Sequence, residues 1–385
     1  MPWAPQNLMN KRSEFAQKAL QADNFAELCR EYGISPKTGY KWRKRFLEEG
    51  AQGMRDQSRR PKSSPEKLGE EVVCRIVRLK QRHAKWGPQK LREVYRREHG
   101  SAPSESSFKR VLEKCGLVEK RTARRRVASG RIAEGRKAVA CNEVWTVDFK
   151  GWWHDRDGRC EPLTVRDEYS RYLLEMRALP DARTGTVQSC FEQLFATYGL
   201  PGCIRSDNGA PFASPNGLLG LSRLSVWWLA NGINLERSRP GCPQDNGGHE
   251  RLHRDIAAEL EGVKYEERQA AFETWRREFN EKRPHQALGM KVPQEIYEHS
   301  TRRWQGGASA LEYVGKMKRR VNRTGYISHA SHSIFISQAL AGWDVGLKPS
   351  GGGRYEVYFA ELLLGELESA TAAFQGVTTQ PSQNN

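Results

Sequence analysis

Runs with helical periodicity fill the first fifty residues of the chain. Residues 13–21 and 25–32 have the pattern of two short helices, and a glycine turn follows them. Ser35 is a favourable N-cap for a third helix with the sequence PKTGYKWRKRFLEE, and Pro36 is a favourable first residue. The pattern therefore predicts three helices, of which the last is rich in lysine and arginine.

This third helix combines one apolar face with basic faces. Trp42 and Phe46 are four residues apart and predict the buried face. A helix, a glycine turn and a basic helix are typical of a helix-turn-helix module, whose last helix enters the major groove of DNA. An ordinary three-helix bundle has the same periodicity, and that alternative stays open. The candidate DNA contacts on the remaining faces are Lys37, Thr38, Lys41, Lys44 and Arg45.

Two segments of the basic region carry charge without hydrophobic periodicity. Residues 50–67 (GAQGMRDQSRRPKSSPEK) combine glycine, serine, proline and charge, which predicts a linker. Arg59 and Arg60 are candidate minor-groove contacts within it, although a solvated linker has the same composition. Residues 119–137 predict a second, basic tether that becomes ordered only on DNA.

A second helical unit lies between these segments. The periodic pattern covers residues 70–83 and resumes after Gly87 and Pro88, and Ser104 then caps a helix over residues 105–115. The arrangement resembles another helix-turn-helix module. Its last helix carries the candidate DNA contacts Lys109 and Arg110, beside Ser106 and Ser107.

From Asn142 the hydrophobic pattern changes from helical to alternating. In NEVWTVDFKGWW, Trp145, Val147 and Phe149 fall on one face and Asp148 on the other, as in a half-buried strand. Two further strands, joined near residues 167–170, complete a predicted three-stranded meander.

Helical and extended runs then alternate along the chain. A helix begins inside CPQDNGGHERLHRD and is preceded by predicted helices over 184–198 and 221–231 and strands over 202–206 and 233–238. The order β-β-β-α-β-α-β-α is that of an RNase H-like domain. Another helix is predicted over residues 265–282.

Short alternating runs return between residues 311 and 368, which predicts a small β-barrel. The final residues, TTQPSQNN, predict a disordered tail. Basic residues at the start of this region are further candidates for gripping DNA, namely Lys316, Lys318, Arg319, Arg320 and Arg323.

The charge is placed very unevenly along the chain. Residues 1–140 contain 34 Lys and Arg against 16 Asp and Glu, a net charge of +18, whereas the remainder carries −1 of the total +17. A basic block of this size usually binds a polyanion, because each phosphate that is neutralised releases counterions. The charge therefore favours nucleic acid as the partner of the first third, over an anionic membrane or a merely solvated surface.

Cysteine usage and hydropathy exclude several classes of protein. The eight cysteines are scattered without a CxxC motif, which argues against a zinc site or a disulfide framework. The first residues have no apolar core of a secretory signal, and no apolar run approaches the length of a membrane span. These features predict a cytoplasmic, nucleoid-associated protein with buried or neutral thiols.

Three carboxylates occupy unusual positions in the predicted core. Asp148 lies within an apolar strand, where aspartate is depleted; Asp207 follows a strand in an Asp-Asn-Gly turn; and Glu250 lies at the start of a helix. Each has an ordinary explanation when taken alone: a strand-edge residue, a turn residue, and a glutamate near the positive end of a helix dipole. Their occurrence together, in this order, indicates a shared site.

The motifs that carry these acids resemble those of one family, the DDE transposases of bacterial insertion sequences with a retroviral-integrase-like core. The matching segments are WTVD (145–148), SDNGAPF (206–212), PQDNGGHE (243–250), RPHQALG (283–289) and VPQEIY (292–297). Two features depart from the retroviral members. The N-terminal His/Cys zinc module is absent, and SPNGLLGLSR lengthens the spacing between Asp207 and Glu250.

The resemblance implies a DNA transposase with Asp148, Asp207 and Glu250 as catalytic residues and metal ligands. Two Mg²⁺ ions roughly 4 Å apart, replaceable by Mn²⁺, would stabilise the attacking and leaving oxygens of an in-line displacement. Asp148 would bind both ions, and the other two acids one each. Water would first attack a phosphodiester at the element's end, and the freed 3′-OH would then attack target DNA.

The glycines before Glu250 need a reason, since each costs about 1 kcal/mol relative to alanine within a helix. Gly247 and Gly248 are predicted to let the DNA backbone approach the helix start. His249 and His253 are expected to be solvated, with a place flanking the site as the alternative. Neighbouring candidate DNA contacts, for which ordinary surface roles remain an alternative, are Gln244, Asn246, Arg251 and Arg254.

The expected protein is thus multidomain α+β. The expected domains are a helix-turn-helix domain (1–50), a linker (51–67), a second helix-turn-helix domain (68–118), a basic linker (119–141), an RNase H-like catalytic core (142–300), a small β-barrel (310–368) and a tail (369–385).

Double-stranded DNA is the expected partner, both as terminal repeats and as target. Because two element ends must be joined in concert and one core holds one set of acids, a homodimer or larger homo-oligomer is expected on DNA. No Walker motif is present, so any ATPase would be a separate helper. A transposase-derived regulator without catalysis, and a nuclease that cuts without joining, are the alternative functions.

Overall fold

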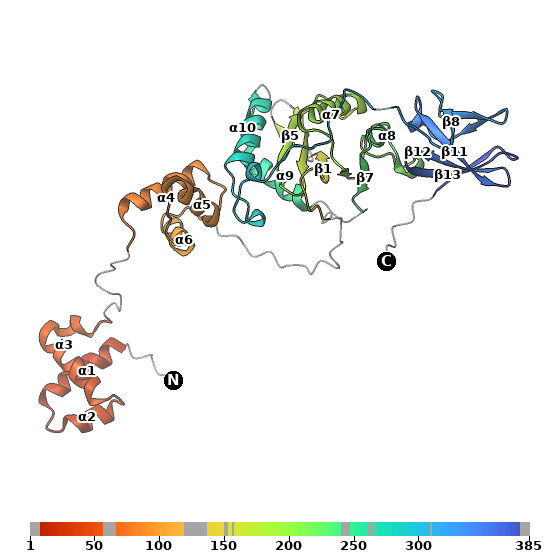
Figure 1. The fold of residues 1–385 in the computed structure, drawn as a ribbon. Coiled ribbons are helices and arrows are strands. Elements are labelled where there is room, and N and C mark those ends of the chain that lie inside the picture. The colour runs from red at the N-terminus through yellow and green to blue at the C-terminus, as the bar shows by residue number, and fades with distance from the viewer. Residues whose placement is uncertain are drawn as a thin grey trace. The chain divides into compact units, whose positions relative to one another are not determined.

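A computed structural model describes nine stretches of the chain, and for residues 153–155 and 158–160 the description is confined to the backbone (Figure 1). The chain forms two compact units, Met1–Gly69 and Glu70–Asn385. The described stretches are 8–56, 67–118, 137–149, 153–155, 158–239, 247–260, 263–264, 267–308 and 310–377.

The first unit is a small helical domain with its own core. The side chain of Ser35 accepts a hydrogen bond from the Thr38 amide at 3.3 Å, so the predicted N-cap is confirmed. Phe15, Cys29 and Trp42 are buried together. Arg59 and Arg60 lie outside the described residues. The elements are α1 (Leu8–Gln21), α2 (Phe25–Glu31), α3 (Pro36–Glu49) and a 3-10 turn (Gly50–Met54).

Three helices begin the second unit, as the periodicity predicts. Ser104 accepts a hydrogen bond from the Ser107 amide at 3.2 Å and caps the last of them. Leu91, Tyr95 and Phe108 are buried between the helices. The helices are α4 (Glu70–Arg82), α5 (Pro88–His99) and α6 (Glu105–Lys114).

This three-helix module contacts α10 (Arg268–Glu281) and the loop after it. His83 Nδ1 lies 2.8 Å from Glu278 Oε1, and Arg97 donates a 2.7 Å hydrogen bond to Glu295. The module and the following domain therefore form one compact unit.

A five-stranded sheet organises the centre of the second unit, in the order β5-β4-β1-β6-β7. β1 pairs antiparallel with β4 and parallel with β6, and β6 pairs parallel with β7. The predicted sequence of strands and helices is confirmed, with a short hairpin of β2 (Trp153–Asp155) and β3 (Gly158–Cys160) added. The sheet strands are β1 (Val144–Phe149), β4 (Pro162–Asp167), β5 (Leu173–Ala178), β6 (Cys203–Ser206) and β7 (Asn234–Arg237).

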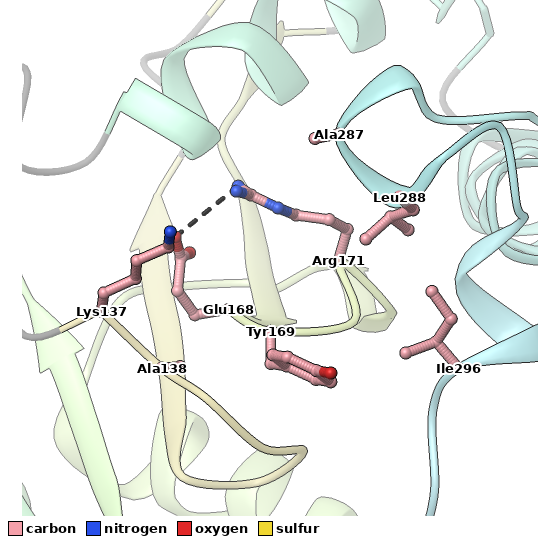
Figure 2. Close-up of a pocket in the computed structure, with 8 residues that line it drawn as sticks. All are labelled: Lys137, Ala138, Glu168, Tyr169, Arg171, Ala287, Leu288 and Ile296. Atoms are coloured by element: carbon pink, nitrogen blue, oxygen red, sulfur yellow. Dashed lines mark ion pairs between the residues drawn. The ribbon is translucent and has the colours of Figure 1, made fainter.

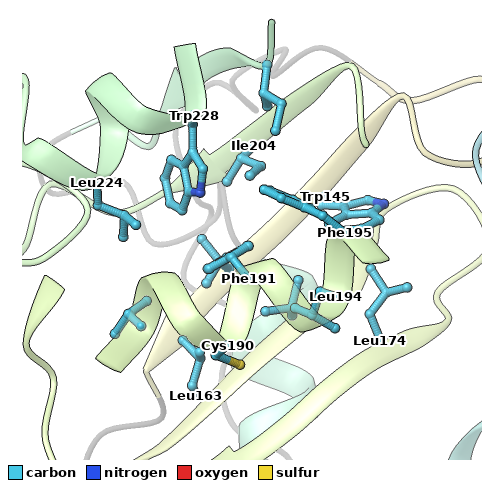
Figure 3. Packing of buried hydrophobic residues seen from close by; sticks show 14 of the residues in the cluster. Trp145, Leu163, Leu174, Cys190, Phe191, Leu194, Phe195, Ile204, Leu224 and Trp228 are labelled. Carbon is cyan, nitrogen blue, oxygen red and sulfur yellow. The ribbon is translucent and has the colours of Figure 1, made fainter. Parts of the chain in front are cut away.

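Helices cover both faces of this sheet. On one face, α7 (Thr184–Tyr198) and α8 (Arg223–Ala230) bury Phe191, Phe195 and Trp228 against Trp145 and its neighbours (Figure 3). On the other face, α9 (Gly247–Leu260) and α10 pack on residues of β5. The alternation in β1 follows from this arrangement, because Trp145 and Val147 belong to the first core and Asp148 points away from it.

The predicted C-terminal β-barrel is not confirmed. The described strands form an open antiparallel sheet, β14-β13-β12-β11-β8, and a separate hairpin, β10-β9. Packing explains the open form, because hairpin residues and elements of the central domain, including Leu221 and Val226, cover the apolar face of the sheet. The strands are β8 (Met317–Arg320), β9 (Tyr326–His329), β10 (His332–Phe335), β11 (Asp344–Gly351), β12 (Arg354–Phe359), β13 (Leu362–Glu368) and β14 (Ala373–Gly376).

The SPNGLLGLSR insertion has a structural place in this interface. Leu221 is buried in the C-terminal core, and Leu218 packs against that core and approaches Gly376.

No helix in the described stretches is long and apolar enough to cross a membrane. The six cysteines that the structure describes in full are free thiols, and Cys74 and Cys115 among them are exposed.

Candidate active site

The site is built around Asp148, the penultimate residue of β1. Asp148 pairs with Thr164 of β4, and its side chain is 25% exposed. β1 is a central strand of the sheet, because it pairs with β4 on one side and with β6 on the other. Asp148 is therefore a half-buried acid in the middle of the sheet.

Asp207 reaches the same edge of the sheet from the neighbouring strand. It directly follows β6, which is parallel to β1, so the carboxyl ends of both strands lie at one edge. Its exposed side chain accepts a 3.1 Å hydrogen bond from the Gly209 amide. Arg237 of β7 fixes this turn by donating to Ser206 Oγ at 3.0 Å and to the Phe212 carbonyl at 2.7 Å.

Glu250 is exposed in the first turn of α9, and its charge acts on Asp148. The pKa of Asp148 is raised to about 7, first by burial, then by the charge of Asp207, and also by that of Glu250. Each repulsion falls with distance, so both carboxylates act on Asp148 from nearby. Strand, turn and helix thus bring the three predicted acids into one region.

Another acid of the sheet, Asp167, has a different role. Its buried carboxylate accepts hydrogen bonds from the amides of Asn142 at 2.7 Å and Ser170 at 2.8 Å. Burial raises its pKa, whereas these hydrogen bonds favour the charged form. Asp167 therefore stabilises the turn between β4 and β5 and has no free oxygen surface comparable with that of Asp207.

The expectation that the two histidines of α9 are solvated is wrong. His249 is fully buried, and burial lowers its pKa well below the ordinary value. His253 Nε2 lies 2.9 Å from Thr164 Oγ1, and its Nδ1 lies 4.0 Å from Asp148 Oδ2. Both histidines face β4 because α9 packs on the sheet. His253 therefore lies beside Asp148, although the charged residues around it in the sequence favoured an exposed position.

The structure also changes the interpretation of the two glycines. A Cβ placed on Gly248 would lie 2.7 Å from Cζ of Arg166 and closer still to its terminal nitrogens. Gly248 therefore leaves room for a protein side chain and not for DNA. A Cβ on Gly247 would meet nothing within 4 Å, so this position alone keeps the predicted open approach.

The donor set suits a hard divalent cation, although the carboxylates are not gathered as a ready-made site. In the part of the chain that the structure describes, no group of three or more His, Cys, Asp or Glu side chains is arranged to hold a metal. Carboxylate oxygens are the preferred ligands of Mg²⁺. Burial, and then repulsion from Asp207 and Glu250, raise the pKa of Asp148, and a bound cation would relieve this repulsion. The residues therefore fit Mg²⁺ in chemistry.

The candidate DNA contacts on α3 do not form a uniform surface. Lys37, Lys41 and Lys44 are exposed on one side, beside the exposed ring of Tyr40. Arg45 is half-buried, with its guanidinium 5.2 Å from the centre of the Trp42 ring. Sequence periodicity did not single out Tyr40, which stacks on Phe25 at a centroid distance of 4.2 Å. Thr38 also lines the shallow depression between these side chains.

The other candidate DNA contacts lie on separate elements of the second unit. Lys109 and Arg110 are exposed on α6, and Arg251 and Arg254 are exposed on α9. Gln244 and Asn246 lie outside the described residues. In the C-terminal sheet, Lys318 and Arg320 pair with Asp344, so part of their charge is used within the protein.

A cavity of about 290 Å³ lies away from these carboxylates (Figure 2). Glu168 and Arg171, which line it and are 3.6 Å apart, follow the end of β4 that pairs with the start of β1. Asp148 lies near the other end of β1. The cavity therefore belongs to the opposite edge of the sheet.

Comparisons with known proteins assign both parts of the chain. Integrase core domain models match residues 138–243 and 231–293. A helix-turn-helix domain model matches residues 11–62, and a homeodomain-like domain model matches residues 38–112. The chain thus combines DNA-binding helix-turn-helix domains with an integrase core.

The similar proteins come from insertion elements. The chain is 25% identical over 241 residues to the "Insertion element IS407 uncharacterized 31.7 kDa protein" of Burkholderia multivorans, covering 61% of this chain and 83% of that protein. It is 24% identical over 232 residues to the "Insertion element IS476 uncharacterized 39.2 kDa protein" of Xanthomonas euvesicatoria, covering 58% and 64%. The resemblance to insertion-sequence transposases with an integrase-like core is confirmed.

Two solved structures are among those to which the chain is similar. The catalytic core domain of BIV integrase has a TM-score of 0.31 at 24% identity, covering 40% of this chain and 93% of that chain. A chain of the simian T-cell lymphotropic virus intasome in complex with PP2A regulatory subunit B56 gamma has a TM-score of 0.38 at 12% identity, covering 73% and 91%.

Proposed function

We propose that this chain is a DNA transposase that binds the terminal repeats of an insertion sequence and catalyses Mg²⁺-dependent DNA cleavage and strand transfer. Asp148, Asp207 and Glu250 are the proposed catalytic residues and metal ligands. The observation that carries the proposal is the meeting of three acids at one edge of the sheet: Asp148 lies at the carboxyl end of β1, Asp207 follows the parallel strand β6, and the charges of Asp207 and Glu250 both act on Asp148. An acid with a perturbed pKa beside further carboxylates is characteristic of a functional site.

The proposed chemistry needs little covalent work from the protein. Bound Mg²⁺ would polarise the phosphodiester and stabilise the attacking and leaving oxygens. The three carboxylates would hold the cations, while Arg237 fixes the turn that carries Asp207. His253 and Thr164 lie beside Asp148 and hold the half-buried acid in a defined environment. Positioning of this kind supplies most of the rate in phosphoryl transfer.

Joined DNA products provide the direct test. The protein is incubated with the DNA ends of its element, a target plasmid and Mg²⁺, and the products are sequenced. Covalent junctions between element ends and target support the proposal. Cut ends without junctions indicate a nuclease, and bound but intact ends indicate a regulator without catalysis.

The basic face of α3 is the proposed reader of the terminal repeat. Lys41→Ala should weaken binding by about 1–3 kcal/mol and reduce sequence discrimination if Lys41 contacts a base. Binding should also weaken steeply with salt. Fluorescence anisotropy with repeat and scrambled DNA measures both effects in a full-length Glu250→Gln protein, which is expected not to cut the probe.

Arg45→Ala is the matched comparison for this prediction. Lys41 Nζ and the Arg45 guanidinium lie at similar distances from the Trp42 ring centre, 4.8 Å and 5.2 Å, but Arg45 is half-buried and Lys41 is exposed. The loss of Arg45 should therefore weaken binding to repeat and to scrambled DNA more equally than the loss of Lys41. Undiminished affinity and discrimination in Lys41→Ala would remove α3 from the reader role.

The proposed active species is at least a dimer on DNA. A mixture of Asp148→Asn protein with protein lacking residues 1–69 should regain strand transfer if one subunit binds DNA and another catalyses. The truncation follows the boundary between the two compact units, so it leaves the second unit intact. Full activity from a complex shown to be monomeric by light scattering would contradict this. The comparisons give no support to an ATPase helper, and none is proposed.

A further inference from the structure

Three contacts connect the start of α9 to β4. The Gly248 backbone lies against the guanidinium of Arg166. The buried His249 ring is hydrogen-bonded to the Thr164 backbone, and His253 Nε2 lies 2.9 Å from Thr164 Oγ1. Glu250 lies between these contacts in the sequence. The position of Glu250 is therefore determined by how the first two turns of α9 pack on β4.

Arg166 is the most unusual member of this interface. Its side chain is 5% exposed, and it forms an ion pair with Glu168. Arg171 lies 3.6 Å from the other oxygen of Glu168. A buried guanidinium is costly unless it is paired, so Glu168 and the surrounding structure hold it in one place. An arginine end is flexible in principle, but this one has no open solvent into which it can move.

We propose that Arg166 is a positioning residue, which braces the first turn of α9 through the space that Gly248 leaves open and thereby sets the position of Glu250. The inference rests on the proposed catalytic role of Glu250. It explains why a residue with poor helix propensity occurs two residues before the proposed catalytic acid. Any side chain at position 248 would push either the helix start or the guanidinium out of place.

Gly247 provides a matched control for this proposal. Alanine has the higher helix propensity at both positions, so propensity alone predicts a firmer helix start for Gly247→Ala and Gly248→Ala alike. The added methyl group meets open space at position 247 and Arg166 at position 248. The brace therefore predicts opposite outcomes for two adjacent and chemically identical changes.

A second change should restore the damaged variant. Methionine at position 166 matches arginine as far as the Nε position and lacks the terminal fork that the Gly248→Ala methyl group would meet. The double variant Gly248→Ala/Arg166→Met should therefore lose less strand-transfer activity than the product of the two single losses. Arg166→Lys, which keeps a charge beside Glu168, serves as a second partner if Arg166→Met does not fold.

The experiment combines two measurements on the full-length variants. Amide hydrogen exchange over residues 247–260 reports the helix start without reference to catalysis, and single-turnover strand transfer with increasing Mg²⁺ reports the site. Gly248→Ala should exchange about tenfold faster or more. Strand transfer should fall by roughly 10²-fold, the usual cost of a misplacement of about 1 Å, with a higher Mg²⁺ requirement. Gly247→Ala should exchange no faster than wild type, because its methyl group meets no atom within 4 Å.

Two results would overturn the proposed role of Arg166. One is amide exchange in Gly248→Ala at the same rate as in Gly247→Ala. The other is a double variant whose loss of strand transfer equals the product of the two single losses. The proposed function fails separately. If exchange shows the coupling between positions 166 and 248 while Glu250→Gln transfers strands normally, the brace stands and the catalytic assignment of Glu250 does not.

Discussion

Glu250→Gln is expected to abolish cleavage and strand transfer while leaving terminal-repeat binding intact. The amide keeps the shape of the side chain and removes the charge that would hold a cation. Loss of metal-assisted stabilisation of several kcal/mol corresponds to a fall of roughly 10³-fold or more. Both steps should fall together, because one site is proposed for both. Quantitative gel analysis of cut and joined products measures the loss of catalysis, and fluorescence anisotropy measures whether terminal-repeat binding is kept.

Asp148→Asn and Asp207→Asn should behave in the same way. Combining any two of the three changes should cost little more than one, because members of a single metal site act as a unit. Mn²⁺ is expected to restore part of the activity, since it is a carboxylate-binding ion with a higher general affinity for such sites.

Glu281→Gln is a suitable control for the removal of a carboxylate. Glu281 is the exposed last residue of α10, and its loss should leave both reactions unchanged. Near wild-type transposition by Glu250→Gln would mean that another group supplies the third ligand. Asp245, which lies outside the described residues, would then be the first candidate.

Local sequence rules predicted much of the fold because they act over a few residues. Ser35 and Ser104 cap their helices as expected, and α7 covers the predicted range Thr184–Tyr198. Alternation in WTVDF placed Asp148 on the polar side of β1. The motifs predict Asp148, Asp207 and Glu250 as one site; in the structure burial, and then the charges of Asp207 and Glu250, raise the pKa of Asp148.

Long-range packing decided the features that the sequence could not predict. The charged residues around His249 and His253 suggested a solvated helix face, but β4 buries one histidine and contacts the other. Several local features could explain a glycine at position 248. The contact with Arg166 is visible only in the folded structure, where the sheet places the Arg166 guanidinium against Gly248. Alternation likewise predicts one apolar face in the C-terminal sheet without showing whether closure or another domain covers it.

The helical module of α4–α6 is a further case, because its contacts with the core come from scattered residues. Burial, and then the charge of Arg283, lower the pKa of Lys90 on α5 to about 8. The Arg283 guanidinium lies 5.8 Å from the centres of the Trp86 and Trp275 rings. One arginine therefore connects the helical module to α10 of the core.

Arg283→Met is expected to destabilise the second unit by about 3 kcal/mol, the lower end of the cost of breaking a buried ion pair. The Arg283 side chain is 4% exposed and lies 2.7 Å from Asp255 and 3.7 Å from Glu259. Methionine fills much of the volume but leaves both carboxylates without their cation. Urea unfolding followed by tryptophan fluorescence, to which Trp86 and Trp275 contribute, measures the change.

Arg277→Met separates this effect from the general loss of an arginine. The Arg277 side chain is 63% exposed, and its Nε lies as far as 4.0 Å from Glu273 Oε1. The loss of this exposed pair should therefore cost less than about 1 kcal/mol of stability. Adding Asp255→Asn to Arg283→Met should recover part of the stability, because one of the unpaired charges is then removed. Equal destabilisation by Arg283→Met and Arg277→Met would show that the buried arginine does not hold the helical module on the core.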